Sequence, residues 1–180
     1  MDFLALSLLR QSDRNYLDQP VEQEKLTRIL ESARMAPSAC NAQPWKVVVV
    51  DRPELKNQVA DATSDSVSGL NHFARQAPVH LVIVQEAANL TSRLGGWIKK
   101  KQYPLIDIGI FAEHLCLAAA SEGLGSCIIG WFNEPLVKKI LNIPGSKRVP
   151  LIVLIGYPGK ETRKKARKDF SEIVCYNSYR

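Results

Sequence analysis

The sequence predicts a single layered domain of helices packed on a β-sheet, in the α+β or α/β class. Its 180 residues are an ordinary length for one domain, and no repeat or linker divides residues 1–180. Four short runs rich in valine and isoleucine indicate strands, and segments with apolar residues three and four apart indicate helices. Hydrophobic residues make up 46% of the chain and charged residues 23%, a composition that excludes a disordered protein.

Helices and strands alternate along the chain. A first helix from about Leu4 is expected to run on through Arg14, and a second helix, over 22–34, ends before Pro37. The later expected elements are strands over 47–50, 79–84, 126–129 and 149–155, and helices over 53–62, 107–122 and 135–141. Residues 64–76 are expected to be weakly helical, and residues 86–102 to form a mobile connection.

The expected helix over 107–122 is apolar on nearly every side, through residues such as Ile108, Phe111 and Leu115. Such a helix needs cover all round, and one sheet of four short strands hardly provides it. We therefore expect a second copy of the chain to pack at or near this helix, as an isologous dimer.

The N-terminus, MDFLALSLLRQSDR, has no basic region before its apolar residues and no cleavage site of small residues after them. We interpret it as an amphipathic helix of a cytoplasmic protein rather than as a signal peptide. No uncharged apolar stretch approaches the roughly 20 residues of a membrane helix, so no membrane partner is expected. The four cysteines form no CxxC pair, which favours reduced thiols over a disulfide or zinc scaffold.

The sequence carries none of the usual catalytic motifs. Its histidines, His72, His80 and His114, have no metal-ligand spacing, so no metal site is expected, and His80 is interpreted as a core residue. There is no GxSxG, P-loop or GxGxxG motif, and nothing names a base for Cys40. A chain without reactive groups of its own often takes its chemistry from a cofactor.

Three segments offer groups that would hold an anionic cofactor. Residues 10–14 (RQSDR) place two arginines four apart, on one face of the expected helix, where forked donors could grip a phosphate. Residues 37–45 (PSACNAQPW) place hydroxyl and amide groups among small side chains, which suits the edge of a planar heterocycle. Residues 159–180 carry seven Lys or Arg against three Asp or Glu, which indicates either an anionic partner or a solvated tail.

These segments resemble the FMN-dependent nitroreductase family. The resemblance rests on residues 10–16 (RQSDRNY), 32–45 (SARMAPSACNAQPW) and 117–126 (LAAASEGLGS), and it continues through residues 144–158. It covers nearly the whole chain, in order. Two positions depart from the family pattern, because Gln11 stands where Arg or His is usual and Ile129 stands where some bacterial members have Glu.

The resemblance implies an α+β, three-layer fold, with a central mixed, mainly antiparallel sheet of four or five strands flanked by helices, in an intertwined homodimer. It also implies two FMN molecules at the dimer interface, with the basic tail of residues 159–180 reaching the partner. The residues implied to hold the phosphate and ribityl chain are Arg10, Gln11, Ser12, Arg14, Lys165 and Arg167. Those implied to line the isoalloxazine ring are Pro37, Ser38, Ala39 and Asn41 of the other chain, Ile128, Ile129 and Gly130 along the reactive edge, and Asn71 at the pyrimidine part.

The implied activity transfers a hydride from NADH or NADPH, through N5 of bound FMN, to a small electron-poor acceptor such as a nitroaromatic or a quinone. Both substrates would use one ring face in turn, which predicts ping-pong kinetics, and no catalytic side chain is expected. Acceptor choice would depend on what covers the ring, with Trp97, Tyr103, Trp131 and Phe132 as candidates.

Other functions remain open at this point. An FMN enzyme of the same fold could reduce enones, remove halogens reductively or destroy flavin. A nucleic-acid-binding protein could use the basic tail, although no aromatic residue interleaves with its cations. A flavin-binding protein without turnover is a third alternative.

Overall fold

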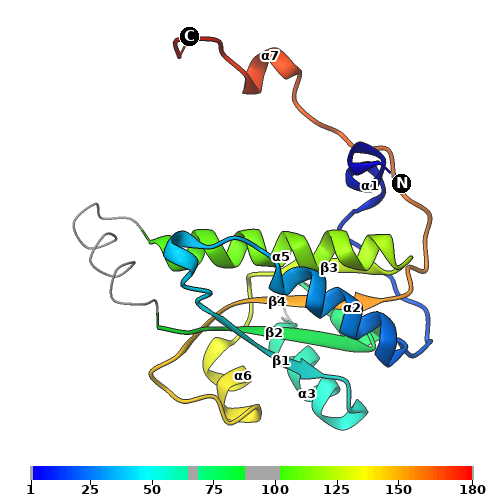
Figure 1. The fold of residues 1–180 in the computed structure, drawn as a ribbon. Coiled ribbons are helices and arrows are strands. Elements are labelled where there is room, and N and C mark those ends of the chain that lie inside the picture. The colour runs from blue at the N-terminus through cyan, green and yellow to red at the C-terminus, as the bar shows by residue number, and fades with distance from the viewer. Residues whose placement is uncertain (1, 65–68, 88–101, 180) are drawn as a thin grey trace.

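A computed structural model describes residues 2–64, 69–87 and 102–179. Four antiparallel strands form its sheet: β1 (Trp45–Val50), β2 (Val79–Gln85), β3 (Gly125–Ile129) and β4 (Arg148–Gly156). Their order is β1-β2-β4-β3, so that β1 and β3 are the edge strands (Figure 1). The expected sheet is confirmed with four strands in the described residues, and a parallel bridge joins Ser12 to Ser126 at the edge of β3.

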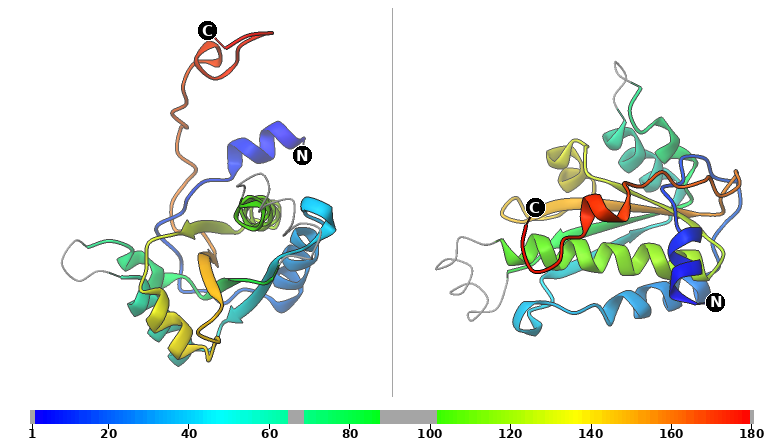
Figure 2. Two further views of the ribbon diagram at one scale, coloured as in Figure 1. Left: turned by 90° about the vertical axis from the view of Figure 1, so that its left-hand side faces the viewer. Right: turned by 90° about the horizontal axis from the view of Figure 1, so that it is seen from above.

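Helices cover both faces of this sheet. They are α2 (Gln23–Arg34) and α5 (Tyr103–Ser121) on one face, and α3 (Pro53–Thr63), α6 (Glu134–Ile140) and the 3-10 helix η2 (His72–Gln76) on the other. The other described helices are α1 (Phe3–Leu9), the 3-10 helix η1 (Ala39–Asn41) and α7 (Phe170–Ile173). Helix α1 lies over α5, and α7 stands away from the sheet (Figure 1). One core cluster joins α2 and α5 to the sheet, and a second joins α3, η2 and α6 to its opposite face. The expected three-layer α+β fold is therefore confirmed (Figure 2).

The central strands are buried on both faces, as their continuous apolar runs predict. Along β2, Leu81 and Ile83 belong to the cluster under α2 and α5, whereas Val82 belongs to the other cluster. The run of valines in β1 was expected to be buried as well, and this is wrong for most of it, because β1 lies at the sheet edge. Only Val50 is fully buried there, and Val49 is exposed.

His80 lies within β2 and has no exposed surface, which confirms it as a core residue. Its Nε2 is 2.9 Å from the carbonyl oxygen of Ala74. Its Nδ1 is buried and has no hydrogen-bond partner among the described residues.

Helix α5 runs through the middle of the molecule, and its central role was predicted correctly. It is the one described helix that is long and apolar enough to cross a membrane by length and composition alone. Ile108, Phe111 and Leu115 are buried against the sheet and α2. The apolar composition of α5 therefore reflects its position in the core. Its outward side is uncovered in the single chain, with Leu105 42% and Ile106 54% exposed.

The first helix is shorter than expected. It ends at Leu9, and Ser12, two residues beyond Arg10, makes a bridge to β3 instead of a helical turn. The expectation that Arg10 and Arg14 share a helix face is therefore wrong. Pairing with the open edge of β3 satisfies the backbone of this segment, and its Ser and Asp residues have low helix propensity.

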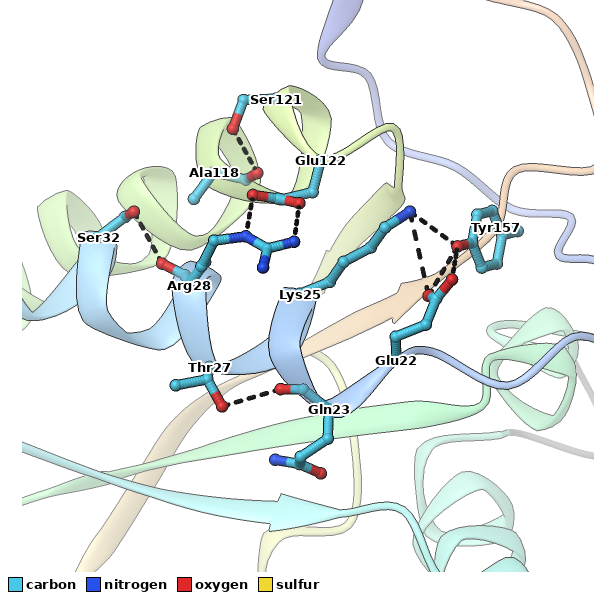
Figure 3. Close-up of polar contacts among 10 residues, drawn as sticks. All are labelled: Glu22, Gln23, Lys25, Thr27, Arg28, Ser32, Ala118, Ser121, Glu122 and Tyr157. Carbon is cyan, nitrogen blue, oxygen red and sulfur yellow. Dashed lines mark hydrogen bonds and ion pairs between the residues drawn. The ribbon is translucent and has the colours of Figure 1, made fainter.

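Polar contacts fix α2 to the end of α5 and to the residue after β4 (Figure 3). Arg28 donates through Nε and Nη2 to the two carboxylate oxygens of Glu122, both at 2.8 Å. Lys25 donates to the Tyr157 hydroxyl at 2.8 Å, and that hydroxyl donates to Glu22. These bonds hold Tyr157 in place, two residues before the basic tail begins at residue 159.

Some expectations lie outside the described residues. They include most of the mobile connection expected over 86–102, with Trp97. The expected role of Trp97 in covering a ligand therefore also lies outside the described residues. Of the expected weak helix over 64–76, residue 64 and residues 69–76 are described, and they contain the 3-10 helix η2 at the C-terminal end.

Candidate functional site

Segments from the two ends of the chain enclose a cavity of about 310 Å³. In Figures 1 and 2 the chain after β4 passes beside α1 before it runs away from the sheet. Among the described residues the cavity lining holds cations and no carboxylate: Arg10, Gln11, Ser12, Arg14, Arg163, Lys164, Lys165, Ala166 and Arg167. The structure thus brings together all six residues that were predicted to hold a phosphate and ribityl chain.

The N-terminal segment that lines this cavity is fixed to the edge of β3. The N–H of Asp13 donates to the Ser126 carbonyl at 2.8 Å, and the Ser126 N–H donates to Asp13 Oδ2 at 3.2 Å. Gly125 makes room for this carboxylate, since a Cβ at that position would lie 2.7 Å from Asp13 Oδ2. Residues 10–14 are therefore positioned by strand pairing and by one buried side chain.

The basic tail is tied to the same segment. Arg163 donates through Nη2 to the Ser12 carbonyl at 2.9 Å, and through its backbone N–H to Gln11 Oε1 at 3.1 Å. Lys165 Nζ donates to the carbonyl oxygen of Arg10. These contacts place the tail cations beside the arginines of the N-terminal segment.

Two of the cations are oriented by groups outside the tail. Arg10 Nε lies 3.3 Å from Glu113 Oε1 on α5. The guanidinium of Arg14 lies over the ring of Phe73, 6.0 Å from its centroid, which is a cation–π contact. Both arginines are thus held at the cavity wall.

Positive charge is crowded in this cavity. Burial, followed by the nearby charges of Arg10 and Arg167, lowers the pKa of Lys165 below its usual range. Burial also raises the pKa of the Asp13 carboxyl, although hydrogen bonds from Gln11 and Ser126 oppose that change. An anion in the cavity would relieve the repulsion among the cations.

The segment predicted to line a ring lies elsewhere, on η1 and the residues around it. Its backbone is unusual, because Cys40, Asn41 and Gln43 all have positive φ, between 45° and 52°. Ser38 Oγ accepts from the Gln43 N–H at 2.9 Å.

Helix α5 anchors this loop at two points. The Ala39 N–H donates to Asp107 Oδ1 at 3.1 Å, and Trp45 stacks on Phe111 with ring centroids 4.7 Å apart. Asp107 is buried, and its Oδ2 has no hydrogen-bond partner among the described residues. The loop therefore has a fixed conformation, while Pro37 and Asn41 are exposed.

One chain does not bring this loop to the basic cavity. The loop contacts α5 at Asp107 and the cavity contacts it at Glu113, positions that lie six residues apart and so on different sides of a helix. Figures 1 and 2 show η1 beside the start of α5 and α1 over its other half. A site that uses both groups of residues would need two chains.

The remaining predicted residues lie near the open edge of β3. Ser126 turns its backbone groups away from β4, so Ile128, two residues on, presents its N–H on the same edge. The side chain of Ile128 is 38% exposed, that of Ile129 is buried, and Gly130 is exposed. Asn71 donates through Nδ2 to the carbonyl oxygens of Thr63 at 3.1 Å and Trp131 at 3.0 Å, which fixes it beside this edge.

Sequence reasoning missed several residues of the site. Arg163 and Lys164 line the cavity, and Asp13 holds the segment of residues 10–14 to β3. Arg163, Lys165 and Arg167 are spaced two residues apart, and an extended chain turns alternate residues to one side. This spacing is the sequence signal that could have identified Arg163. No signal indicated that Asp107 would anchor the loop.

The family model for the nitroreductase family matches residues 9–71 and 67–157 of this chain. The chain belongs to the nitroreductase family. The match includes the N-terminal half of the basic cavity, the loop around η1 and all of β3, whereas the cations of the tail lie beyond it.

Relatives of this nitroreductase-family chain have several names. It is 29% identical to an oxygen-insensitive NADPH nitroreductase of Helicobacter acinonychis, over 85% of each chain. It is 27% identical to an iodotyrosine deiodinase of Thermotoga neapolitana, over 97% of each chain. The solved structure of an FMN-dependent nitroreductase from Clostridium difficile matches with a TM-score of 0.78 and 28% identity, over 98% of this chain and 100% of that one.

Proposed function

We propose that this chain is an NAD(P)H-dependent FMN oxidoreductase that passes a hydride to a small electron-poor acceptor such as a nitroaromatic or a quinone. The observation that carries the proposal is the cation-lined cavity, in a chain of the nitroreductase family. The names of the nitroreductase relatives support NAD(P)H as reductant and FMN as cofactor. A cytoplasmic location is part of the same proposal.

The donors in the cavity fit the phosphate end of FMN. Guanidinium groups bind phosphate oxygens through two parallel N–H donors, and Arg14 and Arg167 bring such groups to the cavity together with the ammonium of Lys165. The lowered pKa of Lys165 supports this fit, because a bound dianion would offset the positive charges around it.

We further propose that the enzyme is a homodimer and that each flavin contacts both chains. The uncovered side of α5 exposes Leu105 and Ile106, and an apolar surface of this kind indicates an interface. A second copy packed there would also explain how the loop of residues 37–41 reaches a flavin whose phosphate lies across α5. The end of the tail, with α7, stands clear of its own body (Figure 1) and would reach that partner.

Each group of residues has its own part in the proposed reaction. When bound, FMN would supply the hydride-transfer chemistry at its N5 atom. The basic cavity would hold the phosphate, and the N–H of Ile128 on the β3 edge would meet the reactive edge of the ring. The rigid loop around Ala39, fixed by Asp107, would hold the other side of the ring in place. Fixed donors of this kind stabilise the negative charge that develops on the ring during reduction.

Reductive deiodination is the second candidate function. It is favoured by the match to the iodotyrosine deiodinase, which extends over 97% of both chains. The electron donor and cofactor would be shared with the first candidate, so only the acceptor separates the two.

An anaerobic half-reaction experiment tests the proposed function. Purified protein should carry a flavin spectrum, or gain one when FMN is added, and NADH or NADPH should bleach it. Stopped-flow mixing of the reduced protein with a nitroarene, a quinone, an enone or iodotyrosine then shows which acceptor restores the spectrum fastest. Protein that is still colourless after incubation with FMN and removal of the unbound FMN would refute the proposal.

Matched variants locate the site within that experiment. Lys165→Ala should weaken FMN binding by about tenfold, the lower end for one charge-assisted contact. Lys168→Ala removes the same charge from the same tail, outside the cavity lining, and should leave binding within twofold. Equal effects of the two substitutions would show that only the net charge of the tail matters.

A further inference from the structure

Gln11 lines the basic cavity, yet its amide is committed to other protein groups. Its Nε2 donates to Asp13 Oδ1 at 2.8 Å and to the carbonyl oxygen of Glu161 at 3.4 Å. Its Oε1 accepts from the backbone N–H of Arg163 at 3.1 Å and from Nε of the same residue at 3.3 Å. Both ends of this side chain are therefore engaged, and neither is left to contact an anion directly.

Asp13 decides which end of the amide faces which neighbour. A carboxylate is an acceptor only, so it selects the NH₂ end of Gln11 and turns the carbonyl end toward Arg163. The carboxylate is itself fixed, because it is buried, accepts from the Ser126 N–H at 3.2 Å, and fits against a glycine. The orientation of Gln11 is thus set by the sheet edge below it.

Arg163 is held by this arrangement with part of its guanidinium unused. Its Nε bonds to Gln11 and its Nη2 bonds to the Ser12 carbonyl at 2.9 Å. A guanidinium carries five N–H donors, and Nη1 has no bond to another described residue. Because Arg163 lines the cavity beside Lys165 and Arg167, its remaining donors are available to an anion there.

We propose that Arg163 is a phosphate-binding residue and that the neutral Gln11 is a positioning residue that holds it in the cavity. The proposal rests on the proposed function, since the phosphate in question is that of FMN. It gives Gln11 a role through another side chain rather than through a direct contact. It also gives the tail a cation whose place is fixed by residues 11–13.

A double-mutant cycle tests the proposal. Gln11→Ala, Arg163→Ala and the double variant are compared for binding of FMN and of riboflavin, which lacks the phosphate, by quenching of flavin fluorescence in flavin-free protein. Each single substitution should weaken FMN binding by about tenfold, and the double variant should be no weaker than Arg163→Ala alone. Riboflavin binding should stay within twofold in all three, which shows that the fold is intact.

The salt dependence of FMN binding gives a second readout. Added salt screens interactions between charges, so Arg163→Ala should reduce the loss of affinity on going from low to high salt. Gln11→Ala should reduce it to the same extent, although it removes no charge. Gln11→Met, which keeps the length of the side chain but not its hydrogen bonds, should behave in the same way, and Lys168→Ala should resemble the parent.

Four outcomes would overturn the proposal. Additive losses in the double variant would mean that Gln11 contacts the phosphate itself. An unchanged affinity of Gln11→Ala for FMN would mean that Arg163 needs no support from Gln11. A loss of riboflavin affinity equal to the loss of FMN affinity would mean that the substitutions damage the fold. If the parent binds no FMN, the proposed function fails. The same cycle with inorganic phosphate, measured by calorimetry, then decides the role of Gln11, and absence of phosphate binding refutes this proposal too.

Discussion

Acid should weaken the fold through His80. This side chain is fully buried in β2, with Nε2 bonded to the Ala74 carbonyl and Nδ1 unpartnered among the described residues. Burial, the largest cause, lowers its pKa from the ordinary 6.5 to about 4, and the charge of Lys56 acts in the same direction. The folded protein therefore stays unprotonated at His80 where the unfolded chain already binds a proton.

The sign and size of the effect follow from this difference. Because the pKa is lowered in the folded state, the stabilisation is present above pH 6.5 and is lost as the pH falls toward about 4. One pKa unit corresponds to about 1.4 kcal/mol, so His80 alone should cost about 2 kcal/mol of unfolding free energy between pH 7 and pH 5. That is a large part of the roughly 5–15 kcal/mol typical of a domain.

Urea unfolding of the parent and His80→Gln measures this contribution. Both proteins are unfolded between pH 7 and pH 5 without flavin and at one protein concentration, since ligand and assembly shift apparent stability. The glutamine does not titrate, so the difference between the two proteins should shrink by about 2 kcal/mol as the pH falls. His72→Gln, at an exposed histidine, should follow the parent. Parallel curves for the parent and His80→Gln would refute the reasoning.

Three further predictions concern the supports of the site. Gly125→Ala places a Cβ 2.7 Å from Asp13 Oδ2 and should lower the unfolding free energy by about 1–3 kcal/mol, whereas Gly145→Ala, with open space around it, should be nearly neutral in urea unfolding. Asp107→Ala leaves the half-buried N–H of Ala39 without its acceptor and should cost about 1 kcal/mol. Asp107→Asn keeps an acceptor and should cost less in the same assay. Removal of residues 159–180 takes most of the cations from the cavity and should abolish tight FMN binding, as measured by fluorescence titration. The shortened protein should also be a monomer by light scattering. If it stays a dimer, the role of the tail is limited to phosphate binding.

Local patterns predicted most of the fold. The apolar spacing of α2, with Leu26, Ile29 and Ala33 buried as expected, and the continuous run of β2 reflect periodicity that a short window contains. The half-exposed valines of β1 could not be anticipated in this way. Whether a strand lies at the edge or the centre of a sheet depends on partners that are distant in sequence.

The candidate site was predicted unevenly for the same reason. Cations at both ends of the chain were visible by residue type, and the structure gathers Arg10, Lys165 and Arg167 at one cavity. The helical geometry expected for residues 10–14 was wrong, because long-range pairing of Ser12 with β3 overrode the local spacing. The hydrogen bonds of Gln11 and Asp107 join segments about 70 to 150 residues apart, and no short pattern encodes such contacts.

The outer position of β1 has a consequence for how this protein behaves when it is concentrated. Trp45–Val50 (WKVVVV) is six residues with high β-propensity, no proline and a single charge, the kind of segment that adds to its own copies when an edge is open. Lys46 is exposed on that strand. Its ammonium group would repel an identical strand laid alongside and would therefore oppose fibrous association of the purified protein.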